Sequence, residues 1–139
     1  MVRPRFHLAI PVTDLDAARS FYAKTMGFAE GRSDTHWVDF DMFGHQLVIH
    51  QVEARGGVSG TNPADGDAVP VPHFGAILEV EDWMTLRSRL VAAGTTFVIE
   101  PRVRFESQPG EQHTMFFLDP SGNALEFKAF VDDGQVFAK

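Results

Sequence analysis

The chain contains two similar stretches, and this internal repeat restricts its fold more than any other feature. Each stretch begins with a short apolar segment that carries one histidine, His7 in the first and His73 in the second. Gly27 follows the first histidine by 20 residues, and Gly94 follows the second by 21. A repeat of this length is typical of two copies of one supersecondary unit. We therefore expect one domain over residues 1–139, built from two modules that share a core.

Each module is expected to contain a strand, a helix and then two or three strands, which is an α+β fold. In the first module, Thr13-Asp14 offers a helix N-cap and Gly27 a left-handed C-terminal turn. The second module has the same pattern, with acidic residues at the start of its helix and Gly94 at the end. The expected ranges are 5–52 for the first module, 53–71 for a linker or mobile loop rich in Gly and Pro, 72–131 for the second module and 132–139 for a tail.

Composition excludes several classes of function. The formal net charge of −7 argues against general nucleic-acid binding, which needs clustered Lys and Arg. The chain has no cysteine, so any metal must be held by nitrogen and oxygen ligands. No apolar stretch is long enough for a signal sequence or a membrane span, and a cytoplasmic protein that binds neither nucleic acid nor membrane is the expectation.

Three residues form the candidate metal site: His7, His73 and Glu126. Because side chains alternate along a strand, each of the three falls opposite the bulky apolar residues of its own strand. Each also stands next to a small residue on its own face, namely Ala9, Gly75 or Ala124. This pattern suits a concave sheet with helices outside and a cleft inside. Two imidazoles and one carboxylate would form a facial triad that leaves roughly three positions open on an octahedral divalent ion.

Other residues could contribute to chemistry or to substrate binding. His50 and His113 could act as a general acid or base because an imidazole titrates near neutral pH, or they could be ordinary surface histidines. Arg102, Arg104 and Lys128 could bind an anionic group of a substrate, or could be solvated surface charges. The remaining candidates for an apolar substrate pocket are Phe43, Val48 and Phe116.

The strand–helix–strands repeat, its two histidines and the segment Phe116–Glu126, Phe-Phe-Leu-Asp-Pro-Ser-Gly-Asn-Ala-Leu-Glu, resemble the vicinal oxygen chelate superfamily. This superfamily includes glyoxalase I, bleomycin-resistance proteins, fosfomycin-resistance enzymes and extradiol dioxygenases. The resemblance covers roughly residues 5–131. It implies two βαβββ modules that form a cupped, mostly antiparallel mixed sheet around a divalent metal, with helices on the outer face. It also implies a small-molecule substrate and a homodimer.

One departure from the glyoxalase I pattern lies at Val48, which aligns with Glu126 in the repeat. Glyoxalase I-like members generally place a fourth protein ligand there, and valine cannot coordinate a metal. A register shifted by two residues would instead bring Gln46 or His50 to that position. The three-ligand set is similar to that of the extradiol dioxygenases and the fosfomycin-resistance enzymes, with Fe(II) or Mn(II) expected and Zn, Ni or Co as alternatives.

The resemblance implies a ring-cleaving, extradiol-type dioxygenase as the first functional hypothesis, because the triad leaves adjacent positions for a bidentate substrate and for dioxygen. A second hypothesis keeps the metal without oxygen, as a glyoxalase-like lyase or isomerase or a thiol transferase. A third is a non-catalytic protein that binds a small molecule, as bleomycin-resistance proteins do.

Overall fold

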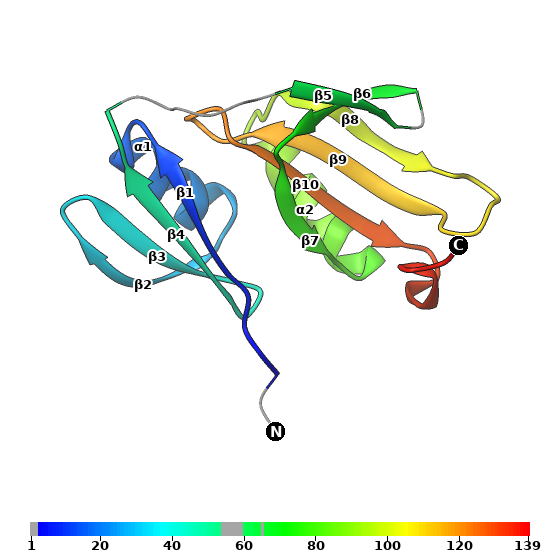
Figure 1. Ribbon diagram of the computed structural model, residues 1–139, viewed down its shortest axis with the longest axis horizontal. Coiled ribbons are helices and arrows are strands. Elements are labelled where there is room, and N and C mark those ends of the chain that lie inside the picture. Colours follow the sequence, from blue (N-terminus) through cyan, green and yellow to red (C-terminus); the bar gives the residue numbers. More distant parts are fainter. Residues whose placement is uncertain (1–2, 54–59, 65) are drawn as a thin grey trace. The chain divides into compact units, whose positions relative to one another are not determined.

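The computed structural model describes residues 3–53, 60–64 and 66–139, which form an α+β fold with two βαβββ modules. The chain divides into two compact units. The first comprises Met1–Gly57 and Asp119–Asn123, and the second comprises Val58–Leu118 and Ala124–Lys139. Each unit contains one module whose helix packs on one face of a four-stranded sheet (Figure 1). The α+β class and the duplicated module are therefore confirmed.

The sheet of the first unit has the strand order β1-β4-β3-β2. Its elements are β1 (His7–Val12), α1 (Leu15–Ser20), η1 (Phe21–Thr25), β2 (Ala29–Asp34), β3 (Trp37–Met42) and β4 (His45–Gln51). β1 pairs with β4 in parallel, and the other two pairs are antiparallel. The strand β2 was not predicted, because its sequence Ala-Glu-Gly-Arg-Ser-Asp is exposed throughout and shows no apolar alternation.

The helix of the first unit begins and ends as the sequence predicts. The side chain of Asp14 accepts a hydrogen bond of 3.0 Å from the backbone N–H of Ala17, which is the expected N-cap. The α-helical turns of α1 continue into the π-helical segment η1, and Gly27 follows with a φ of 77°. Leu15, Ala18 and Tyr22 are buried, so this helical face packs on the sheet.

A tight turn of the first unit, Asp119–Asn123, is organised by one buried carboxylate. Asp119 is 4% exposed and accepts hydrogen bonds from the backbone N–H groups of Ser121 (2.8 Å) and Asn123 (2.9 Å). Its other oxygen accepts from the Asn123 side chain (2.9 Å) and from the hydroxyl of Tyr22 (2.7 Å). The Asn123 side chain also donates to the carbonyl of Pro11 in β1. The turn is thus fixed to both β1 and η1.

The sheet of the second unit repeats the first, with the strand order β7-β10-β9-β8. Its elements are β5 (Gly60–Ala64), β6 (Asp67–Val71), β7 (Phe74–Ile77), α2 (Val80–Ala92), β8 (Phe97–Arg104), β9 (Gln112–Leu118), β10 (Ala124–Phe130) and η2 (Asp133–Gln135). Again the first and last strands of the module pair in parallel, and the other two pairs are antiparallel. The predicted mixed, mostly antiparallel pairing is confirmed within each unit.

Helix α2 covers the sheet face that carries Phe127. Trp83, Leu86 and Leu90 are buried, and the indole N–H of Trp83 donates a 2.8 Å hydrogen bond to the carbonyl of Phe127. Val91 of the same helix is 57% exposed. It lies about 100° around the helix from Leu90 and so misses the buried face.

Part of the range predicted as a loop, 53–71, is regular structure. Residues 54–59 lie outside the described residues, but β5 and β6 form an antiparallel hairpin. Val69 of this hairpin packs with Ile99 and Phe116 in a small buried cluster. The Gly and Pro content concealed these strands, since a short two-stranded hairpin tolerates Pro away from a central ladder. Among the described residues, no helix is long and apolar enough to cross a bilayer.

We predict that Asp119→Ala destabilises the protein by roughly 2–4 kcal/mol, because it leaves the buried hydroxyl of Tyr22 and two backbone N–H groups without an acceptor. Urea unfolding monitored by circular dichroism measures this change. The control Asp41→Ala removes an exposed carboxylate that accepts a single bond from the Gly44 N–H, and it should cost less than about 1 kcal/mol. Equal losses in the two variants would contradict the role given to Asp119.

Candidate functional site

Glu126 is a buried carboxylate on the face of the second unit's sheet that lies opposite α2. It is 8% exposed, and it stands in register with Gly75 on one side and Phe116 on the other. The hydroxyl of Thr114 donates a 2.5 Å hydrogen bond to its Oε2. His73 Nε2 lies 3.3 Å from its Oε1, and Lys128 Nζ lies 3.9 Å from the same oxygen. Oε2 therefore accepts from a neutral hydroxyl, and Oε1 faces the nitrogen atoms of His73 and Lys128.

His73 has a defined ring orientation. Its Nδ1 lies 2.6 Å from the carbonyl oxygen of Pro70 in β6, and its ring stands edge-on to Phe116 with 5.0 Å between the centroids. A carbonyl can only accept, so Nδ1 carries the hydrogen. In the neutral imidazole the lone pair is then on Nε2, beside Glu126. A histidine that donates one ring N–H to a backbone carbonyl is typical of metal ligands.

The contact between His73 and Glu126 shifts the pKa of both side chains. The hydrogen bond with Glu126 raises the pKa of His73 above its usual range, and burial opposes this shift without cancelling it. For Glu126, burial alone would raise the pKa, but hydrogen bonds from His73 and Thr114 and the charge of Lys128 together lower it. Glu126 is therefore ionised at neutral pH, which is the form in which a carboxylate binds a cation.

Gly75 permits the close approach of β7 to Glu126. A Cβ built on Gly75 would overlap the carbonyl oxygen of Glu126, and it would meet the carbonyl carbon at 2.6 Å. Real Cβ atoms do not approach other atoms so closely. Only glycine fits opposite Glu126, whereas the equivalent pair in the first unit is Ala9 and Val48.

In the first unit, His7 is exposed and also has a defined tautomer. Its Nδ1 lies 2.8 Å from Gln46 Oε1. The amide nitrogen of Gln46 donates a 3.1 Å hydrogen bond to Asp39 Oδ2, so the amide oxygen must face the histidine. His7 Nδ1 then carries the hydrogen, and the lone pair of the neutral ring is on Nε2. Both candidate histidines thus use Nδ1 as a donor.

The strand pairing places Val48 at the position that Glu126 occupies in the second unit. Ala9, two residues after His7, pairs with Val48, and Gly75, two residues after His73, pairs with Glu126. The aligned register thus matches the pairing that the structure shows. Among the described residues, no three His, Asp or Glu side chains gather into a metal-binding group. His7 belongs to the first unit, and His73 and Glu126 belong to the second.

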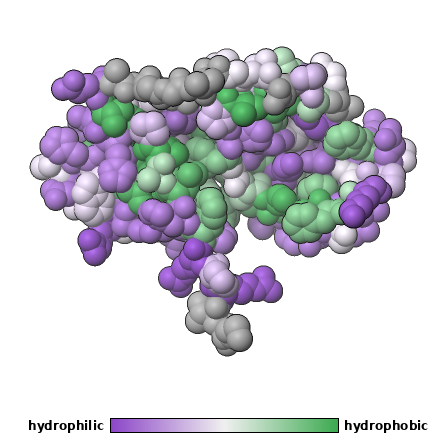
Figure 2. Space-filling view, in the orientation of Figure 1, coloured by the Kyte–Doolittle hydropathy of each residue, from purple (hydrophilic) through white to green (hydrophobic). Residues whose placement is uncertain are grey.

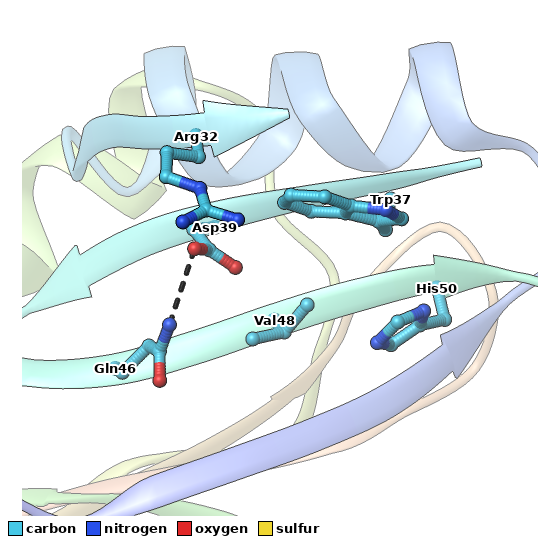
Figure 3. A pocket seen from close by; sticks show the side chains of 6 residues that line it. All are labelled: Arg32, Trp37, Asp39, Gln46, Val48 and His50. Atoms are coloured by element: carbon cyan, nitrogen blue, oxygen red, sulfur yellow. Dashed lines mark hydrogen bonds between the residues drawn. The ribbon is translucent and has the colours of Figure 1, made fainter. Parts of the chain in front are cut away.

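A cavity of about 380 Å³ lies on the same face of the first unit's sheet as His7. Figure 3 shows the six side chains that line it, from β2, β3 and β4: Arg32, Trp37, Asp39, Gln46, Val48 and His50. On the visible side of the first unit, Figure 2 shows apolar side chains next to hydrophilic ones. Of the predicted residues, the structure brings Val48 and His50 to this cavity.

Several predicted residues have other surroundings. His113 lies on the opposite face of β9 from Thr114, with its ring 5.1 Å from Trp83 of α2, so it does not join Glu126. Phe43 is 49% exposed in the turn before β4 and packs edge-on against Phe28 rather than lining the cavity.

The two predicted anion-binding arginines are engaged by the hairpin. Arg102 and Arg104 each lie 3.1 Å from Asp67 Oδ2 in β6, and Arg104 is 5% exposed over the ring of Phe116. Both arginines therefore help to hold β5 and β6 on the sheet, and their binding of a substrate anion stays a prediction. Phe116 itself is 1% exposed and belongs to the buried cluster. Lys128 is half-buried beside Glu126.

The sequence did not reveal the groups that orient the candidate ligands His73 and Glu126. Thr114 stands two residues before Phe116, so strand alternation could have placed it on the face of Glu126. Pro70 acts through its backbone carbonyl, which no side-chain pattern reveals. Arg32 lies at an irregularity in the pairing of β2 with β3, between Glu30 and Ser33, in a strand that the sequence did not predict.

Comparisons with known proteins agree with this architecture. The family model described as Glyoxalase/Bleomycin resistance protein/Dioxygenase superfamily matches residues 6–127. The glyoxalase/bleomycin resistance protein/dioxygenase from Alicyclobacillus acidocaldarius is 32% identical, with a TM-score of 0.80 and 96% of each chain covered. No curated protein matches the sequence.

Two further solved structures share the fold at lower identity. The fosfomycin resistance protein FosX from Listeria monocytogenes is 17% identical, with a TM-score of 0.71, and the match covers 98% of this chain and 100% of that one. Lactoylglutathione lyase from Agrobacterium tumefaciens is 21% identical, with a TM-score of 0.67, and the match covers 98% of this chain and 97% of that one. At these identities the likeness shows the fold alone.

We predict that Gly75→Ala costs roughly 1–3 kcal/mol of unfolding free energy, because the added methyl group forces β7 away from Glu126. The same substitution should shift the imidazole NMR signals of His73, whose partner moves. The control Gly60→Ala adds a methyl group in open space on β5 and should change stability by no more than about 0.5 kcal/mol. Unchanged stability and unchanged His73 signals in Gly75→Ala would contradict the close approach.

Proposed function

Because the chain belongs to the Glyoxalase/Bleomycin resistance protein/Dioxygenase superfamily, we propose that it is a divalent-metal-dependent enzyme for a small substrate with neighbouring oxygens. Within this proposal, His7, His73 and Glu126 are the metal ligands. Ring cleavage of the extradiol type is the reaction that the three-ligand set favours. Fold likeness alone is a weak warrant for a reaction, so the proposal depends on the ligand geometry.

The observation that carries the proposal is the pairing of His73 with Glu126. Two donor atoms about 2.1 Å from one ion and at right angles to each other are about 3.0 Å apart. The separation of His73 Nε2 from Glu126 Oε1, 3.3 Å, is close to this value. Both groups also have an orienting partner, Pro70 and Thr114. These features fit a metal ligand pair with its supporting hydrogen bonds.

His7 fits the third ligand position by its chemistry. Gln46, whose amide donates to Asp39, accepts from its Nδ1–H and leaves Nε2 as the nitrogen with a lone pair. The proposal requires a first-unit face and a second-unit face to bind one ion, supplied by one chain or by the two chains of a homodimer. Homodimers therefore belong to this proposal as one way of completing the site.

A bound divalent ion would supply Lewis-acid chemistry for two neighbouring substrate oxygens, and three nitrogen and oxygen ligands suit Fe(II) or Mn(II), with Zn, Ni or Co as alternatives. The residues of the chain would do the remaining work. Thr114 keeps Glu126 in one orientation, and Lys128 stands beside it with a positive charge. His50, exposed at the cavity, is the proposed acid or base that moves a substrate proton.

We predict that purified protein binds one divalent ion per site, and that His7→Ala, His73→Ala and Glu126→Ala each weaken Mn(II) binding by at least about tenfold, because each removes a ligand. Titration calorimetry with Mn(II), supported by elemental analysis, measures this. The control His36→Ala removes an exposed histidine in the turn between β2 and β3 and should bind metal normally. Full metal retention by both His7→Ala and Glu126→Ala would remove the triad and favour a non-catalytic binder.

Oxygen dependence separates the dioxygenase from the other metal-dependent reactions. We predict that Fe(II)-loaded protein converts catechols to coloured ring-cleavage products in air and not under anaerobic conditions, since dioxygen is a substrate. Absorbance spectroscopy of catechol and 3-methylcatechol reactions measures this. Anaerobic turnover of the methylglyoxal–glutathione adduct, with no reaction of catechols in air, would instead assign a lyase or isomerase.

A further inference from the structure

The first unit's cavity has two chemically different ends, and the strand register sets them apart. Trp37 of β3 pairs with His50 of β4, so two aromatic rings flank one end. Val48 lies between the ends and is 5% exposed, which provides an apolar floor (Figure 3). The cavity's volume of about 380 Å³ is within the usual range for small-molecule sites.

The other end carries one positive and one negative side chain. Arg32 reaches it from the irregular part of β2, and its guanidinium carbon lies 5.9 Å from the centre of the Trp37 ring. Asp39 lines the same end and uses Oδ2 to accept from the Gln46 amide. Within the described part of the chain, Arg32 and Asp39 form no ion pair with each other. A ligand group can therefore contact both.

The charges select the kind of group that fits between them. A carboxylate would be attracted by Arg32 but repelled by Asp39, whereas a cation would be attracted by Asp39 but repelled by Arg32. An uncharged group that has an acceptor beside a donor satisfies the guanidinium and the carboxylate together, and hydrogen bonds to charged partners are the stronger kind. Primary carboxamides and lactams have this arrangement.

We propose that this cavity binds a planar, uncharged portion of the substrate whose polar end is a carboxamide-type group, with its ring between Trp37 and His50 and its amide between Arg32 and Asp39. The proposal rests on the proposed function in one respect: Gln46, which lines the cavity, also contacts Nδ1 of His7, a proposed metal ligand, so one side chain joins the cavity to the proposed metal site. The remote part of the substrate would be held here.

Three probes of one shape test the proposal on metal-free protein kept in EDTA: benzamide, benzoate and benzamidine. We expect benzamide to bind about tenfold more tightly than either charged probe, because only it satisfies both charged side chains. Binding is followed by the NMR shift of the Trp37 indole N–H. The buried indole of Trp83, bonded to the Phe127 carbonyl, should not move and serves as an internal reference.

Charge-removing variants should change the order of the probes. Arg32→Gln leaves Asp39 alone and should make benzamidine the tightest ligand, whereas Asp39→Asn should make benzoate the tightest. Trp37→Leu, in which binding is followed by titration calorimetry because the indole signal is lost, should weaken all three probes alike, since it removes the aromatic wall. The control Arg87→Gln removes an exposed arginine of α2 and should leave the order and the affinities unchanged.

Tighter binding of benzoate or benzamidine than of benzamide by the wild-type protein, or equal binding of all three, would overturn the proposal. An order of probes that Arg32→Gln and Asp39→Asn leave unchanged would overturn it as well. The measurement uses no metal, so its failure is distinct from a failure of the metal site. Normal Mn(II) binding with no preference for benzamide rejects only the cavity assignment. A preference for benzamide in a protein that does not bind Mn(II) rejects only the metal triad.

Discussion

The buried carboxylate of Asp119 is the interaction on which the arrangement of the second module's final strand depends. A buried carboxylate is costly unless its oxygens are hydrogen-bonded. Here the turn supplies three donors from its own residues, and the hydroxyl of Tyr22 supplies the fourth. The turn therefore has one stable shape, and the chain leaves it directly into β10. Glu126 is the third residue of that strand, where it opposes Gly75 of β7 and Phe116 of β9.

That register makes the glycine opposite Glu126 a requirement. The parallel pairing of β7 with β10 brings Gly75 so close to the Glu126 backbone that no side chain fits between them. In the first unit the corresponding pair has a methyl group at Ala9. The two modules therefore share the strand pairing but not the close approach of the paired backbones. The closer pair, in the second module, holds the Glu126 carboxylate against Thr114 and His73. There hydrogen bonding outweighs burial and keeps the pKa of Glu126 low.

The repeat was enough to predict the duplicated module, the Asp14 cap, the ends of both helices at Gly27 and Gly94, and the equivalence of Val48 with Glu126. Each of these depends on local chemistry or on alternation, which a sequence shows directly. The contacts that could not be predicted join distant residues or use the backbone. The hydroxyl of Tyr22, for example, donates to a carboxylate 97 residues away. The strand β2 and the β5–β6 hairpin carry too little apolar patterning to be recognised.

The inequality of the two modules has an electrostatic consequence for the proposed chemistry. With valine at position 48, the proposed ligand set contains one carboxylate, so a divalent ion held by it retains one net positive charge. A second carboxylate there would cancel that charge and occupy a position that substrate needs. The remaining charge favours an oxygen pair that becomes anionic during reaction. Val48 meanwhile forms the apolar floor beneath Arg32 and Asp39. In the two proposals, Val48 thus has two roles: it leaves one ligand position of the metal open, and it lines the cavity assigned to the rest of the substrate.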